Sequence, residues 1–283
     1  DIIVLELSLT LLPSKNAFIS VINSLEDKLE LEKLNKNLKV KIDDAIEESK
    51  LKNAILFQSS KMAAMGEMID SIAHQWMQPI GVIGMKLQTL ELDIELNKIT
   101  EKRIKDVVET SEKQIQHLIN TINEFRKFFR PNSRVERVSI KELIDSTILL
   151  MQDSLIKNNI NIKLNGDIDI LIDTNPSEFK HIFINLINNS QDAFNENKID
   201  EHDRDIIFYI KKIDNKTSIT ISDNAGGIPK DIINNIFEPN FTTKTKGTGI
   251  GLYMTKQIIN KNNSTINVKT IDNGTAFNIL INS

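Results

Sequence analysis

Apolar residues recur every three or four positions through the first 130 residues, which is the spacing of one face of an α-helix. Between residues 24 and 60 the repeat is irregular and set among charged residues. It predicts a coiled-coil helix, with a single solvated helix as the alternative. The apolar positions of this repeat are Leu31, Leu34, Leu38, Ile42 and Ala45.

A second apolar repeat continues to about Leu96 and carries one histidine away from its seam. The seam consists of Met65, Ile69, Ile72, Trp76, Ile83, Leu87, Leu90 and Ile94. His74 lies two residues beyond Ile72, so at roughly 100° per residue it points about 200° away from that seam residue. We therefore expect its imidazole to be reachable by another domain or protein. A surface histidine without a function is the alternative.

A third repeat begins after Thr100, a residue suited to cap a helix, and ends before Pro131. It steps by four and three through Ile104, Val108, Ser111, Ile115, Leu118, Ile122, Phe125 and Phe129. The short link after Leu96 predicts an antiparallel helical hairpin. A hairpin cannot cover both of its apolar seams alone, so we expect a homodimer that forms a four-helix bundle.

After residue 135 the pattern changes to short alternating runs between helices, which indicates another kind of domain. This order of elements favours an α+β fold, an α/β sandwich with helices on one face of the sheet. Strands are predicted at 161–164, 168–172, 206–210, 218–221, 265–271 and 275–281, and helices at about 141–157, 176–194 and 251–261.

The patterns divide the chain into an N-terminal segment with a coiled-coil signalling helix (1–60), the hairpin (61–131) and the sandwich domain (135–283). The 283 residues are 40% hydrophobic and 26% charged, which is ample for a core. A net charge of −4 gives no basic surface for nucleic acid. The absence of cysteine excludes disulfides and thiolate metal sites.

No apolar run in the sequence has the length that spans a bilayer, and the nearest, residues 2–12, is short and contains Glu6. We expect this portion to be cytoplasmic. Because the first residue is Asp1 rather than Met, we expect a fragment and leave open an upstream sensor or membrane anchor.

The helix expected at 176–194 has a polar stripe on an otherwise apolar surface. Asn185, Asn189 and Asp192 are spaced by four and three, so two amides and one carboxylate share a side. Oxygen ligands of this kind suit a hard cation such as magnesium carried by nucleotide phosphates. Solvated surface residues are the alternative for this helix taken alone.

Asp223 ends an expected strand and precedes a turn that contains Gly226 and Gly227. A buried carboxylate there can accept a hydrogen bond from an exocyclic amine such as that of adenine, while the glycines let a flat ring approach the main chain. A plain turn explains the glycines nearly as well.

A second glycine run precedes the helix expected at 251–261. Backbone N–H groups of Gly247, Gly249 and Gly251 can hold phosphates at the helix start, with Lys244 or Lys246 adding positive charge. A flexible loop has the same appearance, and the run does not match the Gly-Lys-Ser/Thr phosphate loop.

Taken in order, these segments resemble the H, N, G1, F and G2 boxes of sensor histidine kinases. The resemblance covers about residues 61–283 and implies the ATP-binding fold shared with DNA gyrase, mismatch-repair ATPases and a major heat-shock chaperone. It also implies autophosphorylation of His74 from ATP, followed by transfer to an aspartate of a response regulator receiver domain. The matching stretches are His74-Gln75-Trp76-Met77-Gln78-Pro79, 185–193, 223–227, 237–244 and 247–252.

The resemblance also implies a role for each site residue. Asn189 matches the magnesium-binding amide, with Asn185 and Asp192 beside it. Asp223 matches the adenine-binding carboxylate, and Gly227 belongs to the turn behind it. Lys244 and the three later glycines belong to a mobile lid over the phosphates. The cofactors implied are ATP and Mg²⁺.

Three positions depart from the family pattern. Gln75 stands where Glu or Asp is common; it can orient an imidazole but cannot take a proton, which leaves the base unassigned. Asp70 is a candidate, with a solvated carboxylate as the alternative. Ala225 replaces a usual glycine, and we expect ATP binding to survive. Gln78 stands where relatives place Thr or Asn to position water, which leaves phosphatase activity open.

We expect the coiled coil to be the input, because a rotation or bend at Pro79 would change how the bundle admits the ATP-binding domain. Two other functions fit parts of the pattern. One is an ATP-gated clamp that forms no phosphoprotein, and the other is a degenerate kinase that only docks a regulator. The signal, the cognate regulator and the choice between cis and trans phosphorylation stay open.

Overall fold

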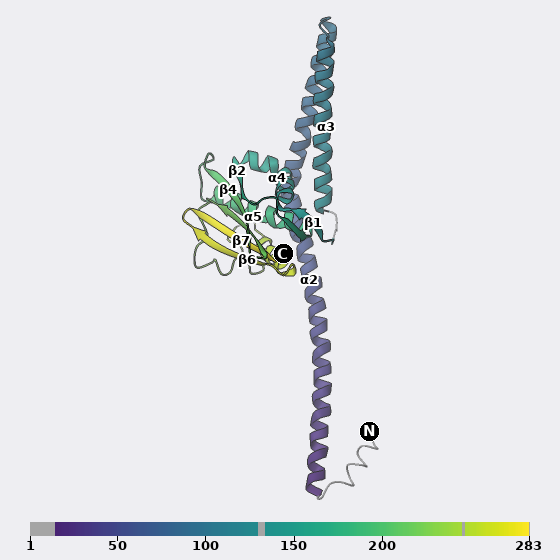
Figure 1. Cartoon of the computed structure of the whole chain (residues 1–283), viewed down its shortest axis with the longest axis vertical. Coiled ribbons are helices and arrows are strands. Elements are labelled where there is room, and N and C mark those ends of the chain that lie inside the picture. Colours follow the sequence, from purple (N-terminus) through teal and green to yellow (C-terminus); the bar gives the residue numbers. More distant parts are fainter. Residues whose placement is uncertain (1–14, 130–133, 245–246, 283) are drawn as a thin grey trace. The chain divides into compact units, whose positions relative to one another are not determined.

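The computed structural model describes residues 15–129, 134–244 and 247–282, and the side chains of residues 15–26, 65, 67, 68, 70–72, 74 and 129 lie outside that description. The chain falls into two compact units, 1–56 and 57–283. Two long helices come first, α2 (Lys15–Glu95) and α3 (Glu101–Phe129) (Figure 1). Helix α2 joins the expected coiled-coil segment and the His74 segment without a break, and Pro79 lies inside it.

The link between α2 and α3 confirms the expected cap of the second helix. The backbone N–H of Arg103 donates to Thr100 Oγ1 over 3.2 Å, which satisfies one of the free N–H groups at the start of α3. Asn97 in the link has a positive φ of 53°, a conformation that asparagine tolerates better than most residues.

The apolar seam of α3 is mostly exposed within the single chain. Val107, Thr121 and Phe128 are buried on this helix, and each lies three residues after a seam residue, at the border of the seam. On α2 the seam residues Met65 and Ile72 lie outside the described side chains. The most exposed seam residues, between 42% and 54%, are Ile69, Leu87 and Ile94 on α2 and Ile104, Val108, Ile115 and Ile122 on α3.

The sandwich domain contains one five-stranded sheet in the order β2-β4-β5-β7-β6, in which only the β2–β4 pair is parallel. A separate two-stranded sheet pairs β1 with β3. The strands are β1 (Glu136–Ser139), β2 (Ile160–Gly166), β3 (Leu171–Thr174), β4 (Arg204–Ile213), β5 (Lys216–Asp223), β6 (Thr265–Ile271) and β7 (Gly274–Asn282).

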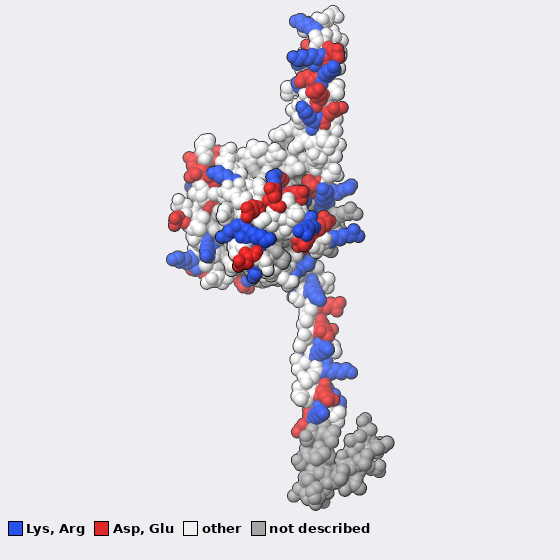
Figure 2. Space-filling model, viewed as in Figure 1, with Lys and Arg blue, Asp and Glu red and all other residues white. Residues whose placement is uncertain are grey.

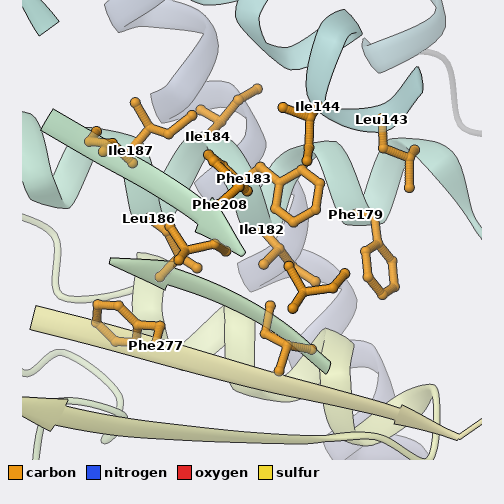
Figure 3. Close-up of a cluster of buried hydrophobic side chains, with 14 of the residues drawn as sticks. Leu143, Ile144, Phe179, Ile182, Phe183, Ile184, Leu186, Ile187, Phe208 and Phe277 are labelled. Atoms are coloured by element: carbon orange, nitrogen blue, oxygen red, sulfur yellow. The ribbon is translucent and has the colours of Figure 1, made fainter. Parts of the chain in front are cut away.

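Helices α4 (Ile140–Lys157), α5 (Pro176–Glu196) and α6 (Gly251–Lys261) cover one face of the sheet, so the expected sandwich of helices and sheet is confirmed. In Figure 3 the apolar side of α5 lies between α4 and the strands. The rings of Phe183 and Phe208 meet edge to face with centroids 5.4 Å apart, and both side chains are fully buried. The opposite face of the sheet is solvated, with Tyr209 45% exposed.

Two expectations about strands need correction. The strand expected at 168–172 begins three residues later, at Leu171, because residues 167–170 form a turn in which Ile170 N–H bonds Asp167 O. Strand β1 was not expected, since its sequence Glu-Arg-Val-Ser shows no clear alternation. Within the described residues no helix is long and apolar enough to cross a membrane. Figure 2 shows acidic and basic side chains interspersed on the visible face.

Candidate nucleotide-binding site

Helix α5 positions most of the candidate site. It starts where the Asn175 side chain accepts from the N–H groups of Ser177 and Glu178, and Pro176 occupies the first turn, where no N–H is needed. Its apolar face is locked in the core, so the polar stripe on its other side has a fixed direction. Each segment that the sequence singled out in this domain contacts that stripe or the residue next to it.

Asn185 joins α5 to the start of α6. Its side chain is only 9% exposed, and its Nδ2 donates to the main-chain oxygen of Gly251 over 3.2 Å and lies 3.4 Å from Thr255 Oγ1. Gly251 is the first residue of α6 and the last glycine of the expected phosphate-binding run. The N-terminal end of α6, which attracts anions, is therefore tied to α5.

Asn189 and Asp192 share one cation, the side chain of Lys244. The Lys244 ammonium donates to Asn189 Oδ1 over 3.1 Å and forms an ion pair with the Asp192 carboxylate. An amide oxygen and a carboxylate that together hold a positive charge are the donors that Mg²⁺ prefers. The expected magnesium ligand Asn189 and its neighbour Asp192 thus lie around one positive charge, and their oxygen donors suit a hard cation.

Asp223 is 7% exposed and is held from three directions. Its Oδ1 accepts from the backbone N–H groups of Ala225 and Thr275, each over 3.0 Å, and its Oδ2 accepts from Ser190 Oγ over 2.7 Å. Each carboxylate oxygen can accept about two hydrogen bonds. Oδ2 therefore keeps capacity for one more donor, which fits the exocyclic amine of adenine.

Two glycines of the site have backbones that a side chain would disturb. Gly227 has a φ of 79°, and a Cβ there would lie 2.6 Å from Thr270 Cγ2. Gly249 has a φ of 65°, and its Cβ would lie 2.4 Å from the Asn240 carbonyl carbon. Both turns need glycine for conformation and for space. Gly247 is similarly close to the Thr242 side chain.

The structure adds positioning residues that the sequence patterns did not reveal. Ser190 orients Asp223, and Asn197 Nδ2 donates to Ala225 O over 2.6 Å, which pins the turn that replaces the usual first glycine. Asn224 links the same turn to the start of β4 through Asp205 N–H. Ser190 lies directly after Asn189, but its side chain points toward a strand 33 residues away, a pairing that no spacing rule could indicate.

The three expected catalytic residues lie on α2. The side chain of His74, like that of Asp70, lies outside the described residues, and Gln78 is exposed. Gln75 is only 4% exposed and donates through Nε2 to Leu149 O on α4 over 3.3 Å. Among the described residues nothing hydrogen-bonds its Oε1. In this structure the Gln75 amide is thus engaged by the ATP-binding domain.

Comparison with known proteins agrees with this geometry. Residues 174–282 match the family model of the histidine kinase-, DNA gyrase B- and HSP90-like ATPase. Sporulation kinase A of Bacillus subtilis is 30% identical over 236 residues, covering 83% of this chain and 37% of that protein. The histidine-protein kinase AtoS of Escherichia coli is 26% identical over 227 residues, covering 79% and 36%.

Sensor protein kinase PilS of Pseudomonas aeruginosa is 25% identical over 223 residues, covering 77% of this chain and 40% of that protein. The chain thus spans about two fifths or less of the length of these relatives. The solved catalytic domain of histidine kinase ThkA covers 53% of this chain and 95% of that one, with 25% identity and a TM-score of 0.46. The chain thus carries a match to the ATPase model, and over most of its length it is similar to the named sensor histidine kinases.

Proposed function

We propose that the chain is an ATP-dependent protein-histidine kinase that phosphorylates its own His74 and passes the phosphoryl group to an aspartate of a response regulator. The observation that carries the proposal is the convergence of three segments on α5. Gly251 bonds Asn185, Lys244 bonds Asn189 and Asp192, and Asp223 bonds Ser190. This arrangement offers an adenine acceptor, a cation site and a phosphate-binding helix start along one helix.

Each residue of the site has a distinct binding role in this proposal. Asp223 accepts the adenine amine, and the start of α6 at Gly251 faces the phosphates with its N–H groups. Lys244 supplies positive charge from the lid. Asn189 would hold Mg²⁺, which neutralises phosphate charge when it is bound. Asn185 and Gly227 keep α6 and the adenine turn in place.

The reaction itself takes place on α2. The lone pair of neutral His74 Nε2 attacks the γ-phosphorus of ATP, a nitrogen–phosphorus bond forms, and the bond from that phosphorus to the β–γ bridging oxygen breaks, so that ADP leaves. The imidazolium that forms then loses its Nδ1 proton to water. Gln75 has no basic group and cannot accept it, so we assign no protein base.

We further propose that the active form is a homodimer. The seam residues Ile104, Val108, Ile115 and Ile122 are more than 40% exposed, and they follow the four-three spacing of a bundle core. A second copy of the hairpin would cover both seams. The expected partners are therefore a second chain and a receiver domain.

Incubation with ATP labelled at the γ-phosphate, with magnesium present, tests the proposal. We expect acid-labile, alkali-stable label on the protein that is lost in His74→Ala. His202→Ala is the matched control, because that histidine is exposed on the ATP-binding domain and should leave labelling unchanged. Chelation of magnesium should abolish the label, and Asp223→Asn should weaken ATP binding by about tenfold or more.

The same assay separates the other two functions. Release of free phosphate with no label on the protein would identify an ATP-gated clamp. If the protein is not labelled and ATP is not hydrolysed, but a receiver domain still binds, the chain is a docking module. Label that persists in His74→Ala would contradict the assignment of the phosphoacceptor.

A further inference from the structure

His181 is a buried histidine of α5 that the proposed reaction does not use. It is 0% exposed, and it lies one helical turn before Asn185. Its surroundings come largely from α2 and α3. We define the hairpin cage by the residues of α2 and α3 that enclose the imidazole, namely Phe57, Ser60, Lys61 and Phe128.

The hairpin cage contacts the imidazole through two aromatic rings and one hydroxyl group. The Phe57 ring meets it edge to face with centroids 5.3 Å apart, and the Phe128 ring stacks at 6.2 Å with 25° between the planes. Ser60 Oγ lies 3.3 Å from Nε2. The Lys61 ammonium lies 5.0 Å from the Phe128 ring centroid and donates to Ser177 Oγ, which closes the cage toward α5.

The other edge of the imidazole faces the nucleotide site, where His181 Nδ1 lies 3.4 Å from Asn185 Nδ2. Asn185 Nδ2 has two hydrogens for three acceptors, Nδ1, Gly251 O and Thr255 Oγ1. Because an amide nitrogen can only donate, its contact with Nδ1 requires that Nδ1 carry no proton. The ring proton is then on Nε2, which donates to Ser60. A single tautomer of the neutral ring satisfies both neighbours.

The electrostatics of the pocket agree with a neutral ring. Burial, followed by the nearby Lys61 ammonium, lowers the pKa of His181 from 6.5 to about 4, although a hydrogen bond to the Ser60 main chain favours the charged form. A proton on Nδ1 would also point at the N–H groups of Asn185 and break that contact.

These contacts form a continuous path from Ser60 through His181 and Asn185 to Gly251 and Thr255 at the start of α6. We propose that His181 is a positioning residue, whose neutral imidazole couples the packing of α2 to the nucleotide site by holding Asn185 and thus the start of α6. This inference rests on the proposed ATP-binding role of α6. Ser60 stands at the expected border between signalling helix and hairpin, where a change in the packing of α2 would reach His181 first.

The tautomer of His181 gives the first test, and it does not depend on activity. We expect nitrogen NMR of the full chain, labelled at histidine and assigned with His181→Gln, to show Nε2 protonated and Nδ1 unprotonated at pH 7. A ring protonated on Nδ1, or one that exchanges between both forms, would overturn the proposal.

Affinity for ATP with magnesium, measured by calorimetry, gives the second test. His181→Leu keeps an apolar side chain but loses both hydrogen bonds, and we expect it to weaken ATP binding about fivefold. His181→Gln can still donate toward Ser60 and accept from Asn185, so it should restore affinity to within about twofold. The matched control is His202→Leu, an exposed position where no change is expected. Equal affinity for wild type and His181→Leu would overturn the proposal, as would a Gln variant as weak as the Leu variant.

Ser60→Ala tests the path from the hairpin side and avoids any change in the ATP-binding domain. Alone it should weaken ATP binding about twofold, and in the His181→Leu background it should have no further effect, because the path is already broken. Additive effects would contradict coupling through His181. A chain that binds ATP but does not label His74 would contradict the kinase proposal and leave these comparisons valid, whereas a chain that binds no ATP would overturn both.

Discussion

The helical hairpin and the ATP-binding domain differ in where their apolar side chains lie. In the domain Phe183, Phe208 and Ile279 are fully buried, whereas in the hairpin Leu87, Ile104 and Ile115 are 43% to 53% exposed. A domain that removes its apolar surface from water within one chain has the main driving force for folding alone. A hairpin that leaves its apolar surface exposed within one chain requires a partner surface to cover it. The two regions should therefore respond differently to the same kind of substitution.

The largest effect is expected in the domain core. Phe183→Ala should lower the free energy of unfolding by about 3–5 kcal/mol, because it removes an aromatic ring packed between α5 and the sheet. Urea denaturation followed by circular dichroism measures the change. Tyr209→Ala, on the solvated face of the same sheet, should cost less than about 1 kcal/mol. Equal losses at the two positions would refute the distinction between the faces.

In the hairpin a substitution should change association instead of folding. Ile115→Lys places a charge in the exposed seam, and the dimer dissociation constant measured by analytical ultracentrifugation should rise about tenfold or more. The unfolding of the ATP-binding domain should not change. Gln116→Lys introduces the same side chain at the next, exposed position and should leave association as it is. A monomeric wild type would contradict the comparison itself.

The hairpin does bury side chains where it contacts α5. The pH dependence of the unfolding free energy should report on this contact. Burial opposes ionisation of Glu124, but hydrogen bonds from Lys127 and Lys180 outweigh it and lower the pKa of Glu124 from 4.5 to about 2. A lowered pKa means that the stabilisation is present above pH 4.5 and is lost as the pH falls through 2. Glu124→Gln should cost up to about 3 kcal/mol of unfolding free energy at pH 7.

The loss caused by Glu124→Gln should shrink as the pH is lowered from 4.5 toward 2, when unfolding is measured at each pH. Glu101→Gln serves as the control, since that carboxylate is 82% exposed in its pair with Lys105. If the difference in unfolding free energy between Glu124→Gln and wild type stays constant with pH, the lysine partners do not lower the pKa of Glu124.

The smallest effect is expected on the polar face of α3. Lys105→Ala removes an ion pair with Glu101 whose side chains are 69% and 82% exposed, and such pairs contribute less than about 0.5 kcal/mol. Thermal melting and the dimer dissociation constant should both be unchanged within error. A clear loss of dimer would mean that this face, rather than the Ile115 seam, contacts the partner.

The fold could be predicted where the sequence pattern is local. Helix α6 begins and ends at the expected residues, and α5 extends the expected helix by two residues, because caps and apolar spacing are short-range signals. Strand β1 and the start of β3 escaped prediction because they are paired only with each other, and that pairing joins residues about 35 positions apart. A strand of four residues has too few positions for alternation to be seen.

The candidate site divides in the same way. Asn185, Asn189 and Asp192 share a side of a helix because of their spacing, and Asp223 ends a strand, so these positions could be found from the sequence. Their partners could not: Lys244 is 52 residues from Asp192, and Thr275 is 52 residues from Asp223. The roles of all these residues, and of His74, stay predictions until they are measured.

The anchoring of Lys244 and Gly251 on α5 has a consequence for nucleotide affinity. Lys244 is held by Asn189 and Asp192, and Gly251 is held by Asn185, so both ends of a short segment are fixed to one helix. The entropy of closing that loop is already lost before a nucleotide arrives. A nucleotide that binds against these two anchors therefore does not bear the entropic cost of bringing them together. Preorganisation of this kind favours release and rebinding of ATP.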